Sequence, residues 1–262
     1  MDGRPIGFFD SGLGGIGVLG EALRRLPAEN YLYFGDTAHI PYGDKPREEV
    51  LRYAHAAVER LTGLGCKAIV IACNTATSVA VGELRQELEL PIIGMEPALK
   101  PASQIEREGR ILVLATRMTL SLEKFQRLML LYGHDALPVP CPGLMECVEA
   151  GELQGAHVNE VLRALLAPYL NMPVKAVVLG CTHYVFLRET IASFFAPEVP
   201  LIDGNAGTIR QLKRRLTEAA LCRDPALPGG RVTFLSSSED ERTLGRMQRM
   251  LERCAQPTLA KV

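Results

Sequence analysis

The sequence predicts an α/β protein made of two pseudo-symmetric parallel-sheet domains that face each other across an interdomain active site. Two observations lead to this prediction. Short apolar runs rich in Val, Ile and Leu alternate with stretches of helical period along the 262 residues, a pattern typical of parallel sheets with helical crossovers. Segments from the first part of the chain also recur in the second part, in the same order.

The apolar runs predict buried strands, because a strand covered by helices on both faces has apolar side chains on both. In chain order these strands are expected at residues 6–9, 31–34, 68–72, 91–94, 111–115, 176–180 and 201–202. The stretches between them place apolar residues at helical spacing, which predicts amphipathic helices. These helices are expected at residues 18–26, 48–64, 77–88, 122–132, 158–170 and 186–195.

The internal repeat is the more informative of the two observations. Its longest match aligns KAIVIACNT at residues 67–75 with KAVVLGCTH at residues 175–183, without a gap and at an offset of 108. Shorter matches at similar offsets pair residues 91–93 with 200–202 and residues 4–11 with 110–116. Short Val- and Ile-rich strands can match by chance, but three matches in a consistent order indicate two related halves.

This repeat divides the chain into two domains. We expect a first α/β domain of residues 1–96 together with 207–262, whose C-terminal helices return to it, and a second α/β domain of residues 97–206. Ligands of open α/β sheets bind at the carboxyl ends of the strands. Two facing domains would therefore share one ligand site.

Composition limits the partners and the compartment. Lys and Arg number 29 and Asp and Glu 30, so a net charge of −1 gives no long-range attraction for nucleic acid, which is an unlikely partner. No apolar run is long enough to span a membrane, and the amino terminus does not resemble a signal peptide, so we expect a cytoplasmic protein. Seven scattered cysteines without a C-x-x-C pair indicate reduced thiols rather than disulfides or a structural zinc site.

Two of these cysteines end predicted strands at equivalent positions of the repeat. Cys73 is followed by Asn74 and Thr75, and Cys181 is followed by Thr182 and a histidine. A single cysteine at such a position is commonly a small core residue. Two at equivalent positions on facing domains would approach one ligand from opposite sides, which favours a function.

Two acid/base groups on opposite faces of one carbon are what inversion of a stereocentre requires. A thiol works near neutral pH only when a neighbouring group helps it to ionise. His183 is one candidate, since it lies two residues after Cys181 and on the same strand face if the extended run continues. Asp10, at the end of the first strand, is another. Cys181 and His183 could form half of a metal site, but no further Cys/His pair lies nearby, so no metal is predicted.

Polar residues on the strand-to-helix turns point to a bound carboxylate. Ser11, Asn74, Thr75 and Thr182 all occupy such turns, where free backbone N–H groups bind anions. The same residue types cap helices. Both roles can coexist at one turn.

A glycine motif at the amino terminus offers an alternative interpretation. Gly12, Gly14 and Gly17 follow the first strand as G-x-G-x-x-G, and Asp36 ends the next strand, as in a dinucleotide-binding fingerprint of an oxidoreductase. The carboxylate of Asp10 would face the pyrophosphate, however. The repeat also favours two short halves over one long sheet.

Five motifs resemble those of the glutamate racemases, within the aspartate/glutamate racemase family. They are DSGLGG at residues 10–15, GDTAHIPYGDK at 35–45, ACNTAT at 72–77, GMEPALKPA at 94–102 and GCTHY at 180–184. The resemblance implies cofactor-independent interconversion of L- and D-glutamate, which supplies D-glutamate for peptidoglycan. It also implies a homodimer.

The resemblance also implies roles for particular residues. Cys73 and Cys181 match the two acid/base thiols, with Asp10 assisting Cys73 and His183 assisting Cys181. Glu149 matches a glutamate near the family's site, although Glu152 is close enough in sequence to leave that alignment open. The residues that match substrate-binding positions are Asp10, Ser11, Tyr42, Gly43, Asn74, Thr75, Thr116, Thr119, Thr182 and His183.

Two positions depart from the family pattern. Val185 stands where proline is usual, and Gly17 stands where a small hydroxyl residue is common. Neither supplies chemistry. A protein of another class, a non-catalytic dicarboxylate-binding protein, would also have a cleft between two domains, but binding alone needs no thiol at either cysteine position.

Overall fold

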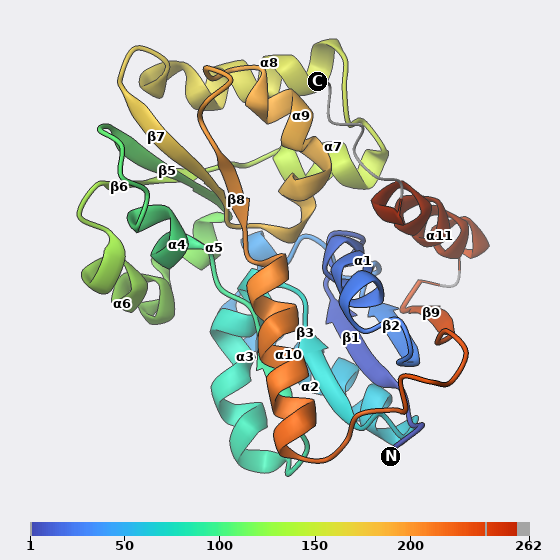
Figure 1. Ribbon diagram of the computed structural model, residues 1–262. Helices are drawn as coiled ribbons and strands as arrows, with labels where there is room; N and C mark the ends of the chain where they lie inside the picture. The colour runs from blue at the N-terminus through green and yellow to red at the C-terminus, as the bar shows by residue number, and fades with distance from the viewer. Residues whose placement is uncertain (1, 239, 256–262) are drawn as a thin grey trace.

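The computed structural model describes residues 2–238 and 240–255, which form two parallel β-sheets covered by helices (Figure 1). The first sheet has the strand order β4-β3-β1-β2-β9 and the second the order β6-β5-β7-β8. The strands of the first sheet are β1 (Ile6–Asp10), β2 (Tyr31–Gly35), β3 (Ala68–Ile71), β4 (Ile92–Gly94) and β9 (Val232–Ser236). Those of the second are β5 (Arg110–Ala115), β6 (Ala136–Pro140), β7 (Val174–Leu179) and β8 (Leu201–Asp203).

The helices lie between these strands and after them. The α-helices are α1 (Ile16–Arg25), α2 (Arg47–Gly63), α3 (Asn74–Glu87), α4 (Leu99–Ser103), α5 (Arg117–Ser121), α6 (Glu123–Tyr132), α7 (Leu144–Ala150), α8 (Ala156–Leu166), α9 (Arg188–Ala192), α10 (Asn205–Glu218) and α11 (Glu241–Ala255). Short 3-10 helices are η1 (Tyr42–Asp44), η2 (Ala167–Tyr169) and η3 (Thr182–Leu187). No helix in the described part of the chain is both long enough and apolar enough to span a membrane.

The two sheets confirm the predicted fold class and the repeat. The order β2-β1-β3-β4 of the first sheet is the order β6-β5-β7-β8 of the second, and all neighbouring strands pair in parallel. The three sequence matches correspond to β1 with β5, β3 with β7 and β4 with β8. The fourth pair, β2 with β6, has no recognisable sequence match.

Several short helices were not predicted, among them α4, α5 and α7, and two strands and the helix after Cys181 also differ from the sequence prediction. Strand β6 was not predicted because it contains Pro138 and Pro140. Prolines are tolerated in this strand because it lies at the edge of its sheet. In the tail, where only helices were expected, β9 pairs with β2 at the other edge of the first sheet. The helix expected at residues 186–195 instead begins as η3 directly after Cys181 and continues as α9.

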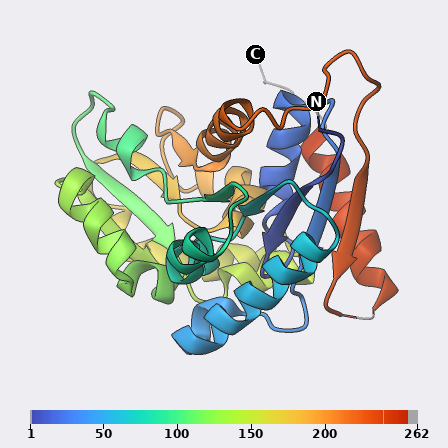
Figure 2. The same ribbon diagram turned by 90° about the horizontal axis from the view of Figure 1, so that it is seen from below.

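Helices cover both faces of the first sheet. Figures 1 and 2 show α1 and α10 on one side and α2 on the other. Phe8 of β1 packs with α1 and α10, whereas Phe9 packs with α2 and α3, as expected when successive side chains of a strand point to opposite faces. The cluster on the Phe8 side continues into the second sheet through Leu112 and Leu179. One face of each sheet therefore belongs to a common hydrophobic core, and the other faces have cores of their own.

An ion pair occurs at the same place in both halves. Lys67, just before β3, contacts the Glu29 carboxylate at 2.6 Å, and both side chains are buried. Lys175, in β7, contacts Asp135 at 2.7 Å, with Asp135 about a third exposed. The repeat thus extends to charged residues at the amino ends of the strands, away from the cavity at their carboxyl ends.

Candidate active site

The carboxyl ends of strands from both sheets border one cavity. Side chains and backbone of the first half meet those of the second half around it. The residues predicted from sequence that line the cavity are Ser11, Tyr42, Gly43, Cys73, Asn74, Thr75, Thr116, Cys181, Thr182 and His183. The two cysteines thus reach a common space from opposite halves.

The Cys73 thiol lies where β3 ends and α3 begins. Its Sγ accepts the backbone N–H of Ala76 at 3.4 Å, as a helix cap, and lies 3.5 Å from the hydroxyl of Ser11. Burial, with a smaller contribution from the charge of Asp10, raises the pKa of Cys73 to about 12. Cys73 is therefore a neutral thiol near pH 7 when the site is empty.

Asp10 reaches Cys73 through Ser11. The Ser11 hydroxyl donates to Asp10 Oδ1 at 3.3 Å, and the same oxygen accepts the backbone N–H of Gly12 at 3.1 Å. From the second half, the hydroxyl of Thr182 donates to Asp10 Oδ2 at 3.1 Å. Burial raises the pKa of Asp10 despite these hydrogen bonds and the nearby His183. The carboxyl group thus links the two halves behind the cavity.

On the other side of the cavity, His183 lies between a thiol and a carboxylate. Its Nδ1 is 3.6 Å from Cys181 Sγ, and its Nε2 is 2.7 Å from Glu149 Oε1. That carboxylate oxygen also accepts the backbone N–H of Leu13 at 2.8 Å. Burial alone would lower the pKa of His183, but the hydrogen bonds with Cys181 and Glu149 outweigh it and raise that pKa well above its usual value.

The sequence argument placed His183 on the same face as Cys181 on the condition that the extended run continues. Strand β7 ends at Leu179, the backbone of Cys181 is still extended, and η3 begins at Thr182. The tight turn of η3, rather than strand alternation, brings the imidazole to the thiol. Of the two glutamates left open by the sequence, Glu149 contacts His183, while Glu152 is half-exposed and pairs with His157.

Asn74 presents a buried amide with nothing to bind in the described structure. Both its Nδ2 and Oδ1 are buried without a hydrogen-bond partner among the described residues, and the residue lines the cavity. A buried amide without partners carries a free-energy cost. A ligand with both donors and acceptors, such as an amino acid, would satisfy it.

Three threonines form a hydroxyl cluster across the two halves. The Oγ1 of Thr75 lies 3.1 Å from that of Thr116 and 3.2 Å from that of Thr119. Thr75 and Thr116 line the cavity, whereas Thr119 is fully buried behind them and bonds to Thr116 at 2.9 Å. Thr119 is therefore placed to orient the other two hydroxyls.

Tyr42 is held at the cavity by Asp36. The tyrosine hydroxyl donates to Asp36 Oδ2 at 2.5 Å, and Asp36 Oδ1 lies 2.7 Å from His39 Nδ1. The side chain of Asp36 is almost completely buried. The acidic residue that the dinucleotide-binding alternative would assign to a ribose therefore fixes the loop that carries Tyr42.

The glycines of the amino-terminal motif allow the two halves to approach each other. A Cβ on Gly12 would lie 2.2 Å from the carboxylate of Glu149, and one on Gly14 would lie 2.5 Å from Thr182 Oγ1. Side chains at these positions would push the second half away. This close packing accounts for the motif without a dinucleotide.

Sequence reasoning missed several residues that line the cavity. They are Pro41, Asp44, Arg117, Cys141, Pro142, Met145, Glu146, Gly180 and Tyr184. Arg117 follows Thr116 at the end of a predicted strand, so the strand-end argument could have found it. Cys141 follows β6, the strand that its prolines concealed.

Comparison with known protein families matches residues 19–212 to the family described as Asp/Glu/Hydantoin racemase. The match covers most of the chain, and the protein belongs to this family. Within it, the chain is similar to the glutamate racemase of Clostridium perfringens (strain 13 / Type A), with 47% identity over 255 residues, 96% of this chain and 98% of that protein.

Solved structures show the same architecture. The glutamate racemase from Thermus thermophilus in complex with beta-chloro-D-alanine is 35% identical, with a TM-score of 0.80 over 95% of this chain and 94% of that one. The glutamate racemase from Francisella tularensis in complex with D-glutamate is 28% identical, with a TM-score of 0.82 over 96% and 95% of the two chains.

Proposed function

We propose that this protein interconverts L- and D-glutamate by a two-thiol acid/base mechanism that needs no cofactor. The observation that carries the proposal is the pair Cys73 and Cys181, which line one cavity from equivalent strand ends of two facing halves. The glutamate racemases to which the chain is similar support the choice of substrate. In a bacterium, this reaction supplies D-glutamate for peptidoglycan.

In the direction from L to D, Cys181 removes the α-proton and Cys73 returns one to the opposite face. The raised pKa of His183 favours an imidazolium, which lies 3.6 Å from the Sγ of Cys181, the group that removes the proton. Cys73, neutral in the empty site, supplies the proton. The step leaves Cys181 as the thiol and Cys73 as the thiolate, which is the state that removes the α-proton of D-glutamate.

The remaining site residues bind and orient the substrate. Asn74, Thr75 and Thr116 offer amide and hydroxyl groups to its carboxylates and amine, and Ser11 and Thr182 do so on the turns beside the two thiols. Asp10 assists Cys73 through Ser11, and Glu149 orients His183. A weakly acidic α-proton requires such orientation and preorganised donors at the carboxylate, where negative charge develops.

Finer points of the proposal rest on the sequence. We expect glutamate to be preferred over aspartate, a homodimer, a cytoplasmic location, and the division into residues 1–96 with 207–262 and residues 97–206. A higher kcat/KM for aspartate would show that the chain acts on the other amino acid. Light scattering on the purified protein would measure the oligomeric state.

Solvent deuterium tests the two-thiol arrangement. In D2O with L-glutamate, early D-glutamate should carry deuterium at Cα while the remaining L-glutamate stays almost unlabelled, because each thiol faces one side. The protein is first dialysed against a chelator and assayed without added pyridoxal phosphate or nicotinamide. Early deuterium in recovered L-glutamate would indicate one base serving both faces. A rate that depends on an added cofactor would also contradict the proposal.

A further inference from the structure

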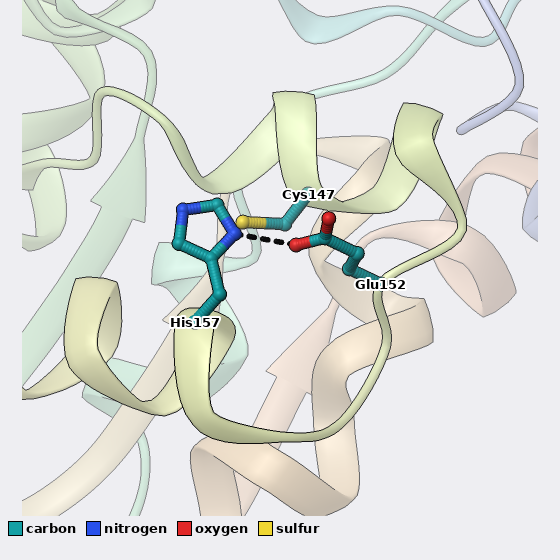
Figure 3. A group of neighbouring side chains, drawn as sticks. All are labelled: Cys147, Glu152 and His157. Carbon is teal, nitrogen blue, oxygen red and sulfur yellow. Dashed lines mark hydrogen bonds and ion pairs between the residues drawn. The ribbon is translucent and has the colours of Figure 1, made fainter.

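Three side chains of metal-ligating types meet outside the cavity, where α7 turns into α8 (Figure 3). They are Cys147 on α7, Glu152 in the turn and His157 in the first turn of α8. Their ligand atoms all lie within 4.8 Å of one another. In Figure 3 the sulfur and the carboxylate both point to the imidazole. None of the three lines the cavity of the proposed reaction.

The backbone of the turn holds these residues together. Gly151 ends α7 in the left-handed region at φ 83°, and the backbone N–H of Glu152 returns to the carbonyl of Cys147 at 2.8 Å. Gly155, at φ 112°, is the N-cap of α8 and lies two residues before His157. Glycine is favoured at both angles. The three ligands therefore come from two helices and the hydrogen-bonded turn that joins them, and they need little ordering to bind an ion.

The chemistry of the three groups selects the ion. A thiolate with an imidazole and a carboxylate suits Zn²⁺ and disfavours Mg²⁺ or Ca²⁺, which prefer oxygen ligands. The side chains of His157 and Glu152 are 66% and 46% exposed, which leaves room for water as a fourth ligand. Within residues 2–238 and 240–255, the ion pair of Glu152 is with His157, and no Lys or Arg pairs with it.

The surrounding charge also favours a cation. The carboxylates of Glu146 and Glu152 place negative charge near the Cys147 thiol, and that of Glu160 places negative charge near the His157 ring. An ordinary surface pair between His157 and Glu152 would contribute little to stability and would need no cysteine beneath it. The buried thiol of Cys147 distinguishes this cluster from such a pair.

We propose that Cys147, Glu152 and His157 bind one Zn²⁺ ion, with water as the fourth ligand. Binding displaces the thiol proton of Cys147 to solvent and replaces the hydrogen bond between His157 and Glu152. The ion would join the end of α7 to the start of α8. Because α7 also carries Glu149, which contacts His183, the ion would stabilise the helix that borders the cavity. The proposal does not depend on the proposed racemisation.

Cobalt substitution tests this site directly. Metal-free protein titrated with Co²⁺ should develop thiolate-to-cobalt charge-transfer absorption and tetrahedral visible bands with one ion per chain, and Zn²⁺ should abolish both. The titration is repeated in the double variant Cys73→Ser and Cys181→Ser, which removes the cavity thiols. The signal should be unchanged there. Its loss in this double variant would place the ion in the cavity and overturn the proposal.

Single variants identify the ligands. Cys147→Ser should remove the charge-transfer band, and His157→Asn should weaken Co²⁺ binding by at least about tenfold while leaving the metal-free racemisation rate unchanged. His157 is exposed, so its variant remains informative if Cys147→Ser fails to fold. His134→Asn is the matched control, because His134 pairs with Asp135 on the surface without a thiol. Absence of a band, its persistence in Cys147→Ser, or equal weakening in His134→Asn would overturn the proposal.

Discussion

His183 has two ring nitrogens, and each has a different partner. Nδ1 faces the Cys181 thiol and Nε2 faces the Glu149 carboxylate. Replacing His183 by Asn removes the acid/base group that contacts Cys181 in the proposed mechanism, so we expect kcat/KM to fall by about 10² or more. The two enantiomers have equal free energy in water, and the loss must therefore be the same in both directions. Optical rotation started from each enantiomer measures it.

A substitution at Glu149 separates the effect of its negative charge from its effect on the position of His183. Glu149→Gln keeps a hydrogen-bond acceptor for the backbone N–H of Leu13 and should lower kcat/KM less than His183→Asn does. If His183→Asn retained most of the activity, the assistance assigned to this histidine would be wrong.

Buried thiols make stability depend on alkaline pH. Burial raises the pKa of Cys66, Cys73 and Cys141 to about 12 from a usual value near 9. A pKa raised by folding means that the folded state holds the proton more tightly. The associated stability is complete below about pH 9 and is lost as pH rises towards about 12. We expect the free energy of unfolding in urea to fall by roughly 2 kcal/mol between about pH 8 and about pH 9.5.

Cys66 provides the control for this pH dependence, because it does not line the cavity. Cys66→Ala should reduce the fall between the two pH values by about a third while racemisation continues. An unfolding free energy that stays constant over this range would contradict the assigned pKa values.

At this scale, the repeat guided the choice of candidate residues. Cys73 and Cys181 could be proposed from sequence because they occupy equivalent positions of the repeat, and both line the cavity. Arg117, Cys141 and Glu146 line the cavity without such a counterpart. Arg117 directly follows a predicted strand, whereas the approach of Cys141 and Glu146 depends on the edge strand β6 and on α7, which local patterns did not indicate.

Between elements, the two departures from the family pattern contact each other. A Cβ on Gly17 of α1 would lie 2.9 Å from Cγ2 of Val185 in η3. A Gly-to-Ser change inside an exposed helix usually helps stability slightly, but here we expect Gly17→Ser to lower the free energy of unfolding by about 1 kcal/mol because of this contact. Urea unfolding measures the effect.

The partner substitution should remove that cost. In a Val185→Ala background, Gly17→Ser should be neutral or stabilising, which gives a coupling energy between the two positions. Simple additivity of the two substitutions would show that the contact has no energetic effect.

The C-terminal helix reaches across to the second half. On α11, Arg246 donates from Nη1 to the backbone carbonyl of Glu149 at 2.8 Å, near the end of α7. A cation at a helix C-terminus is also favoured by the helix dipole. Arg246→Met retains the apolar stem and should lower the free energy of unfolding by about 1 to 2 kcal/mol and kcat/KM several-fold, because α7 carries Glu149.

Arg249, exposed on the same helix, gives the control. Arg249→Met should leave both quantities nearly unchanged. If the two substitutions had equal effects, the hydrogen bond to α7 would not be responsible. The sequence predicted a tail of helices returning to the first half and missed β9, and it could not show which carbonyl an arginine on that tail would bind.

For the whole molecule, the repeat allows one interaction to be compared with its own copy. The Lys67–Glu29 pair is buried, whereas Asp135 of the Lys175 pair is partly exposed. Breaking a buried pair leaves an uncompensated charge, so Lys67→Met should cost about 3 to 5 kcal/mol of unfolding free energy. Lys175→Met should cost about 1 kcal/mol or less. Equal costs in urea unfolding would contradict this dependence on burial.

The repeat also shows what the sequence could predict at this scale. Alternating strands and helices, with matching segments, were enough to predict two similar sheets. The common hydrophobic core between them was not predictable, because Leu112 and Leu179 are simply strand residues in the sequence. The exact domain boundaries stay a prediction.

Strands β5 to β8 follow one another in the chain, while β9 returns to the sheet of β1. Both ends of the described chain therefore attach to the first sheet. A mechanical force applied to these ends would act first on β1, β9 and α11, and it would reach the second half through the hydrogen bond from Arg246 to the carbonyl of Glu149. Tension on these ends, as in a tandem fusion or a surface tether, would therefore load α7, which borders the cavity, as well as the first sheet.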